Sequence, residues 1–67
     1  MQKEQITKNI ERVEIENANA ELMIGFYLYL ADQEKSKEKS AQYKVKADQL
    51  KANVEFNNKF LNYARTL

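Results

Sequence analysis

The sequence predicts an all-α fold: an antiparallel two-helix hairpin with helices over about residues 3–32 and 38–66. Two apolar repeats support this prediction, because each advances in alternating steps of four and three residues, which keeps one seam of a helix against a partner helix. The first repeat consists of Ile6, Ile10, Val13, Asn17, Ala20, Ile24, Tyr27 and Ala31. The second consists of Tyr43, Ala47, Leu50, Val54, Asn57, Leu61 and Ala64. We expect all 67 residues to form a single helical-hairpin domain.

The two repeats fit each other when the chain folds back about Lys37, which pairs seam positions whose residue numbers sum to 74. Almost every layer then joins a large residue to a small one, or two residues of medium size. Asn17 and Asn57 fall in the same layer, and a polar pair inside an apolar seam penalises slipped alignments. We interpret these two asparagines as residues that fix the register. The alternative is a ligand-binding cluster of amides that also includes Asn19, Asn53 and Asn58.

The linker between the repeats is predicted at about residues 33–39, although this segment contains neither proline nor glycine. Ser36 or Ser40 is expected to cap the second helix by accepting a hydrogen bond from one of its first free amides. A single continuous helix is the alternative, since no residue of the linker forbids helix. The heptad count disfavours it: with Ile10 at position a, counting straight on puts Tyr43 at f, whereas its own repeat requires d.

The composition argues against several kinds of site. Cysteine is absent, which removes disulfides and thiolate metal ligands, and histidine is absent too. No glycine-rich phosphate loop and no nucleophile with a neighbouring base is present. Glu11, Glu14 and Glu21 recur at helical spacing, mostly at positions b and e, where a solvated face is the usual interpretation. The sequence therefore predicts no enzyme, no catalytic residue, no cofactor and no metal site.

The location of the protein is predicted from its apolar segments. The run over residues 22–30 is less than half as long as the roughly 20 residues that a membrane-spanning helix needs. Residues 1–5 are polar and charged and lack the apolar core of a secretory signal. We therefore expect an intracellular, cytoplasmic protein that does not enter a membrane. Its small size and its content of lysine, asparagine and isoleucine suggest a bacterial or phage origin.

A second apolar face lies beside the predicted seam, at heptad positions c and g. Near the linker it consists of Met23, Phe26 and Leu30. Near the chain ends it consists of Phe56, Phe60, Tyr63 and Leu67. One small hairpin buries too little surface to offset a chain entropy of roughly 1.5 kcal/mol per residue. We therefore predict a homodimer in which these residues pack two hairpins into a four-helix bundle. The opposite flank is polar, with an expected ion pair between Glu21 and Lys51.

An outer apolar stripe on the first helix predicts a surface for another protein, formed by Ile15, Leu22, Phe26 and Tyr29. Aromatic side chains outside a seam are typical of protein interfaces. The sequence thus favours a small adaptor, inhibitor or regulatory subunit. A structural coiled-coil segment of a larger assembly is one alternative.

A second alternative is an RNA- or DNA-binding hairpin dimer, which would use the lysines around the linker. These are Lys35, Lys37, Lys39, Lys44 and Lys46. The net charge of only +1 and the presence of only two arginines, Arg12 and Arg65, disfavour nucleic-acid binding.

Overall fold

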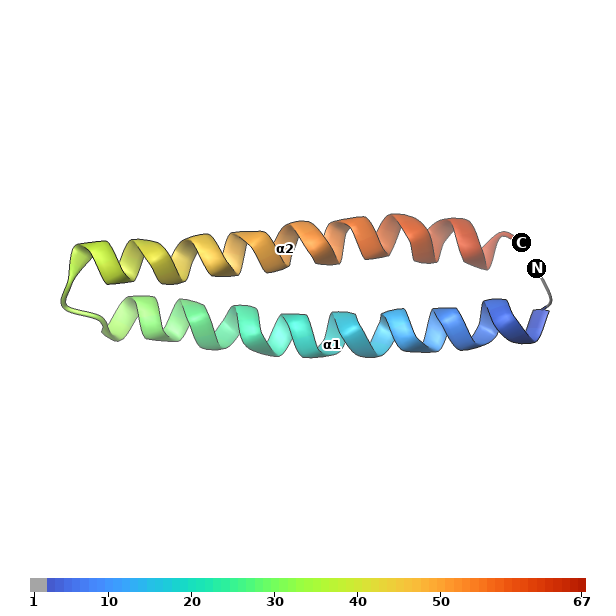
Figure 1. The fold of residues 1–67 in the computed structure, drawn as a ribbon, viewed down its shortest axis with the longest axis horizontal. Helices are drawn as coiled ribbons and strands as arrows, with labels where there is room; N and C mark the ends of the chain where they lie inside the picture. The colour runs from blue at the N-terminus through green and yellow to red at the C-terminus, as the bar shows by residue number, and fades with distance from the viewer. Residues whose placement is uncertain (1–2) are drawn as a thin grey trace.

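The computed structural model describes residues 3–67, which form two α-helices joined by a short turn. Helix α1 spans Lys3–Gln33 and helix α2 spans Lys37–Arg65. The two helices lie side by side and antiparallel in a rod 51 Å long, with the start of α1 and the end of α2 at the same end of the rod (Figure 1). The predicted all-α hairpin is confirmed, and the continuous helix is wrong.

The turn consists of residues 34–36 and is shorter than the linker expected from the sequence. Ser36 is the N-cap of α2: its backbone is extended, and its Oγ accepts a hydrogen bond from the Lys39 amide at 3.4 Å. Ser40, the other capping candidate, instead donates its hydroxyl to the Ala31 carbonyl at 2.7 Å. This bond ties the first turn of α2 to the last turn of α1. Hydrogen bonds of two serine side chains therefore stabilise this turn, which contains neither glycine nor proline.

The seam between the helices contains every residue of both apolar repeats, all of them buried or half-buried. The seam residues with the least exposed surface include three alanines. Ala47 is 0% exposed, and Ala31 and Ala64 are nearly covered. Tyr27 stacks on Tyr43, with ring centroids 6.3 Å apart. Leu61 is the one large apolar side chain among the buried residues of the described chain. The seam is thus a narrow core whose larger side chains remain partly open to solvent.

One ion pair joins the helices within residues 3–67, and it is not the expected one. Arg65 lies 3.5 Å from the Glu14 carboxylate near the chain ends, and both side chains are about half exposed. The predicted pair between Glu21 and Lys51 is not formed, although both residues line one shallow groove together with Glu55. The physical reason is that two long, solvated side chains gain little free energy by pairing in water.

Candidate functional site

Three asparagine side chains form a hydrogen-bonded layer in the middle of the seam. Asn57 donates its Nδ2 to the Oδ1 of Asn17 at 3.0 Å, and Asn17 donates its own Nδ2 to the Oδ1 of Asn58 at 3.0 Å. Asn17 is buried, and no buried side-chain nitrogen or oxygen of the described residues lacks a hydrogen-bond partner. The layer therefore presents no unused buried polar atom to a ligand, which favours the structural interpretation.

Two of the five amides that the ligand hypothesis grouped together lie outside this layer. Asn19 and Asn53 line a groove beside the seam. The hydrogen bond to Asn58 was not expected, because that residue falls at position e, on the flank of the seam. The only sequence signal for it is the doublet Asn57-Asn58, which offers two adjacent amides to one partner.

The hairpin exposes far more large apolar side chains than it buries. Ten of them are between 40% and 74% exposed. They are Ile15, Leu22, Met23, Phe26, Leu28, Tyr29, Val45, Phe56, Tyr63 and Leu67. Where exposed apolar side chains of a soluble protein gather into a patch, the patch usually marks an interaction site.

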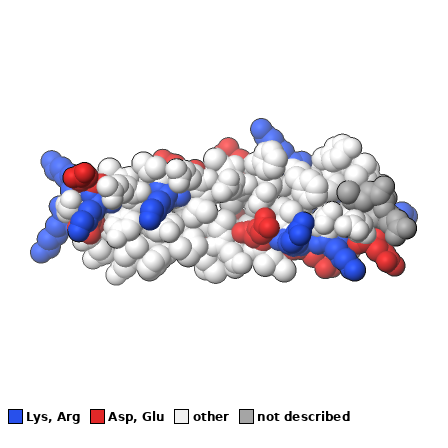
Figure 2. Space-filling view, in the orientation of Figure 1, with Lys and Arg blue, Asp and Glu red and all other residues white. Residues whose placement is uncertain are grey.

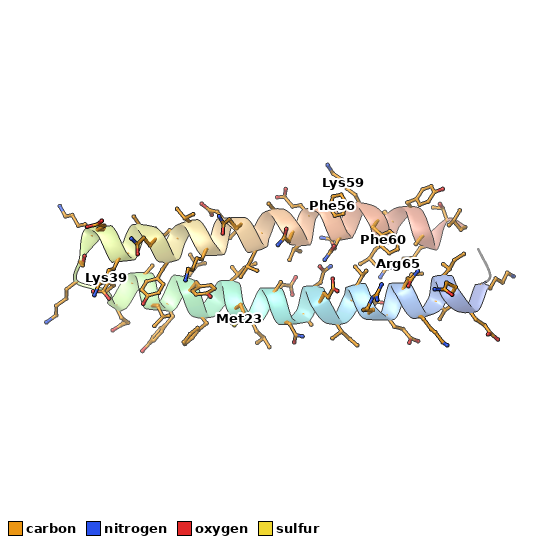
Figure 3. All side chains as sticks on the ribbon, in the orientation of Figure 1. Met23, Lys39, Phe56, Lys59, Phe60 and Arg65 are labelled. Atoms are coloured by element: carbon orange, nitrogen blue, oxygen red, sulfur yellow. The ribbon has the colours of Figure 1, made fainter. Side chains whose placement is uncertain are left out.

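The two clusters predicted at heptad positions c and g form what we call the groove face. Met23 of α1 and Phe56 of α2 line the same shallow hollow of about 410 Å³, together with Asn19 and Asn53. The two clusters predicted at positions c and g therefore share one side of the hairpin. Their members Leu30 and Phe60 are half-buried against the seam. Figure 3 labels Met23, Phe56 and Phe60, and Figure 2 shows in the same orientation a broad stretch without charged side chains.

A second group defines what we call the outer stripe of α1. Ile15, Leu22 and Tyr29 are each at least 60% exposed and are one heptad apart, so they lie on the same side of the helix. Phe26, half exposed, lies between this stripe and the groove face. Gly25 lies alongside, and a Cβ added to it would meet no atom within 4 Å. Another chain is therefore able to approach the α1 backbone closely at this point.

Two exposed apolar residues, Leu28 and Val45, were missed by the sequence analysis. Leu28 falls at position e of α1, and Val45 falls at position f of α2. Neither continues a repeating stripe, so periodicity gave no signal for them. Val45 lines a small hollow on α2 with Ala41 and Gln42.

The lysines of the nucleic-acid hypothesis lie around the turn and the first half of α2. Figure 3 shows Lys39 at this end of the rod, and Figure 2 shows basic and acidic side chains intermixed there. The acidic neighbours include Glu34 and Glu38. Lys46 makes a cation–π contact within the hairpin, because its Nζ lies 5.5 Å from the centroid of the Tyr27 ring. The positive charge at this end is therefore diluted.

No protein-family model, no curated protein and no solved structure matches this chain. Neither helix of residues 3–67 combines the length and hydrophobicity needed to cross a bilayer. In the same residues, acidic side chains do not gather in groups of three or more that would suit a metal ion.

Proposed function

We propose that this protein is a small cytoplasmic adaptor, inhibitor or regulatory subunit that binds another protein on the outer stripe of α1 and performs no catalysis. The observation that carries this proposal is the exposure of Ile15, Leu22 and Tyr29 on one side of the helix. Burying one such side chain in a complex contributes about 1.5–3 kcal/mol. Three of them in line are enough to anchor a helix in an apolar groove of a partner.

The charges beside the outer stripe specify the chemistry of the partner. Glu11, Glu14 and Glu21 lie along the same helix, whereas Arg12 is the only basic residue of α1 between Lys8 and the turn. A partner groove lined with apolar side chains and edged with lysine or arginine complements this surface. The carboxylates then steer the encounter, while the apolar anchors supply most of the affinity.

The test is affinity capture from the cells that contain the protein, with two matched variants. We expect Leu22→Asp combined with Tyr29→Ser to abolish capture of the partner and to leave helicity largely intact, because both side chains are exposed. Changing Lys35, Lys37 and Lys39 together to glutamine is expected to alter only the association rate and its salt dependence.

The reverse pattern would replace this proposal by the nucleic-acid hypothesis. If the lysine variant loses its partner while the Leu22/Tyr29 variant keeps it, the outer stripe is not the binding surface. A bound species that disappears after nuclease treatment, with an affinity that falls steeply as salt increases, would identify RNA or DNA.

A further inference from the structure

We propose that a second copy of this chain covers the groove face, in a two-fold dimer whose two turns lie at opposite ends. The groove face is distinct from the outer stripe, which the proposed function assigns to a partner protein. The surface area of the hairpin, the spacing of the two clusters and the charge distribution favour a second copy on the groove face.

The surface area shows how much of the hairpin remains to be covered. Its accessible surface is 5541 Å². A compact folded monomer of 7.9 kDa exposes about 4,400 Å², so the hairpin exposes about 1,100 Å² more than this scaling allows. A stable protein–protein interface covers about 800 Å² of each partner. Covering one face with a second copy therefore brings the exposed surface close to that of an ordinary globular fold.

The two clusters of the groove face have spacings that complement each other. Met23, Phe26 and Leu30 advance by three and then four residues, whereas the aromatic residues of α2 advance by four and then three. Because facing seam residues sum to 74, Phe56 and Tyr63 lie level with residues 18 and 11 of α1. The clusters therefore form a diagonal band across the face, with the hollow lined by Met23 and Phe56 near its middle.

A half-turn about an axis that crosses the rod near the level of residues 20 and 21 brings the unlike clusters of the two copies to the same levels, on diagonally opposite helices of the resulting four-helix bundle. The Phe56 side chain of the second copy then comes level with Met23, and its Tyr63 comes level with Leu30. Phe60 of the second copy falls within one residue of the level of Phe26. Thioether–aromatic and aromatic–aromatic contacts of this kind are favourable. The unlike clusters of the two copies therefore share the same layers and meet across the core of the four-helix bundle, and every such contact occurs twice, as a two-fold interface requires.

The polar residues at the centre of the groove face are compatible with this interface. Asn19 and Asn53 line the hollow, and each amide carries both donors and acceptors, so each is able to bond a copy of itself near the axis. Glu16 is the one charged residue that lines the hollow, and its side chain is exposed in the single hairpin.

The charge distribution favours opposite directions for the two hairpins. The turn end, residues 32–46, carries five lysines and three acids, whereas the opposite end, residues 3–16 and 58–67, carries five bases and four acids. Two hairpins pointing the same way would bring both lysine-rich turns together. Reversal instead places each turn beside the less positive end of the other copy, which slightly lowers the electrostatic repulsion.

The first experiment measures sedimentation equilibrium of the wild type and of two glutamate variants. We expect a dimer at micromolar concentration, weakened about 30-fold or more by Phe56→Glu, because a charge at the centre of an interface is costly. Phe56 is 72% exposed in the hairpin, so helicity should survive. Val45→Glu is the control, because Val45 is exposed on α2 but lies outside the groove face. Phe60→Glu should dissociate the dimer and also lower helicity, because Phe60 is half-buried against the seam.

The second experiment determines the orientation of the two copies. The chain has no cysteine, so Lys35→Cys supplies a unique site for a spin label in the turn. Opposite orientation predicts a label separation approaching the 51 Å length of the rod. The same orientation would bring the labels within about 20 Å, two interhelical spacings. A short separation overturns the reversed dimer, and a monomeric wild type at high micromolar concentration, or an undiminished Phe56→Glu dimer, overturns the interface. Loss of partner capture with an intact dimer would contradict only the proposed function.

Discussion

Leu61→Ala is expected to unfold a large fraction of the protein at room temperature. Leu61 is 4% exposed and is the one large apolar residue that the described hairpin buries. Truncating such a side chain costs about 2–5 kcal/mol. A core of this size supplies only about 3–5 kcal/mol in total. Far-ultraviolet circular dichroism during urea titration would show the loss as a reduced helical signal and an earlier transition.

The matched control for this prediction is Leu22→Ala. It is the same chemical change on a side chain that is 74% exposed, so the free energy of unfolding should change by no more than about 0.5 kcal/mol. Equal destabilisation by the two variants would mean that Leu61 is no more important to the fold than a surface leucine. The narrow seam would then not be the core of the protein.

Asn17→Leu is expected to lower the free energy of unfolding by about 1–3 kcal/mol, because the change leaves the Asn57 amide unpaired inside the seam. Asn17 is the hub of the layer, since it bonds both Asn57 and Asn58. Asn58 is exposed and is able to bond water instead. The double variant Asn17→Leu with Asn57→Leu should recover the loss, and should be at least as stable as the wild type while tolerating slipped alignments.

Urea unfolding of the wild type, both single variants and the double variant measures the coupling between these residues. Strong non-additivity is the predicted result. Single-variant effects that simply add up in the double variant would contradict the account, because they would mean that the two amides do not depend on each other.

The seam could be predicted residue by residue, since periodicity alone decides which side chains of a helix face a partner. The helix ends were less predictable. The linker is rich in glutamate, lysine and glutamine, which extend helices readily, so α1 continues to Gln33 and α2 begins at Lys37. The identity of the serine that caps α2 depends on the residue at which the helix begins. The sequence did not determine that residue, so Ser36 and Ser40 were both candidates.

Side-chain choices on the flanks could not be predicted. The ion pair of Arg65 with Glu14 and the bond of Asn17 to Asn58 depend on rotamers of long or adjacent polar groups, which heptad positions do not determine. The exposed stripe on α1 was predictable because Ile15, Leu22 and Tyr29 repeat every seven residues. Leu28 and Val45 have no such repeat. Spacing identifies the apolar faces of a helix, but the molecule that covers each face is decided by shape and charge between chains.

The hairpin is expected to complete its fold against a second copy of the chain. The thermal midpoint of unfolding, followed by circular dichroism over about a hundredfold range of protein concentration, tests this expectation. If folding and dimerisation are coupled, the midpoint rises with concentration, because mass action favours the folded dimer. A midpoint that stays the same at every concentration would show that the hairpin folds as a monomer.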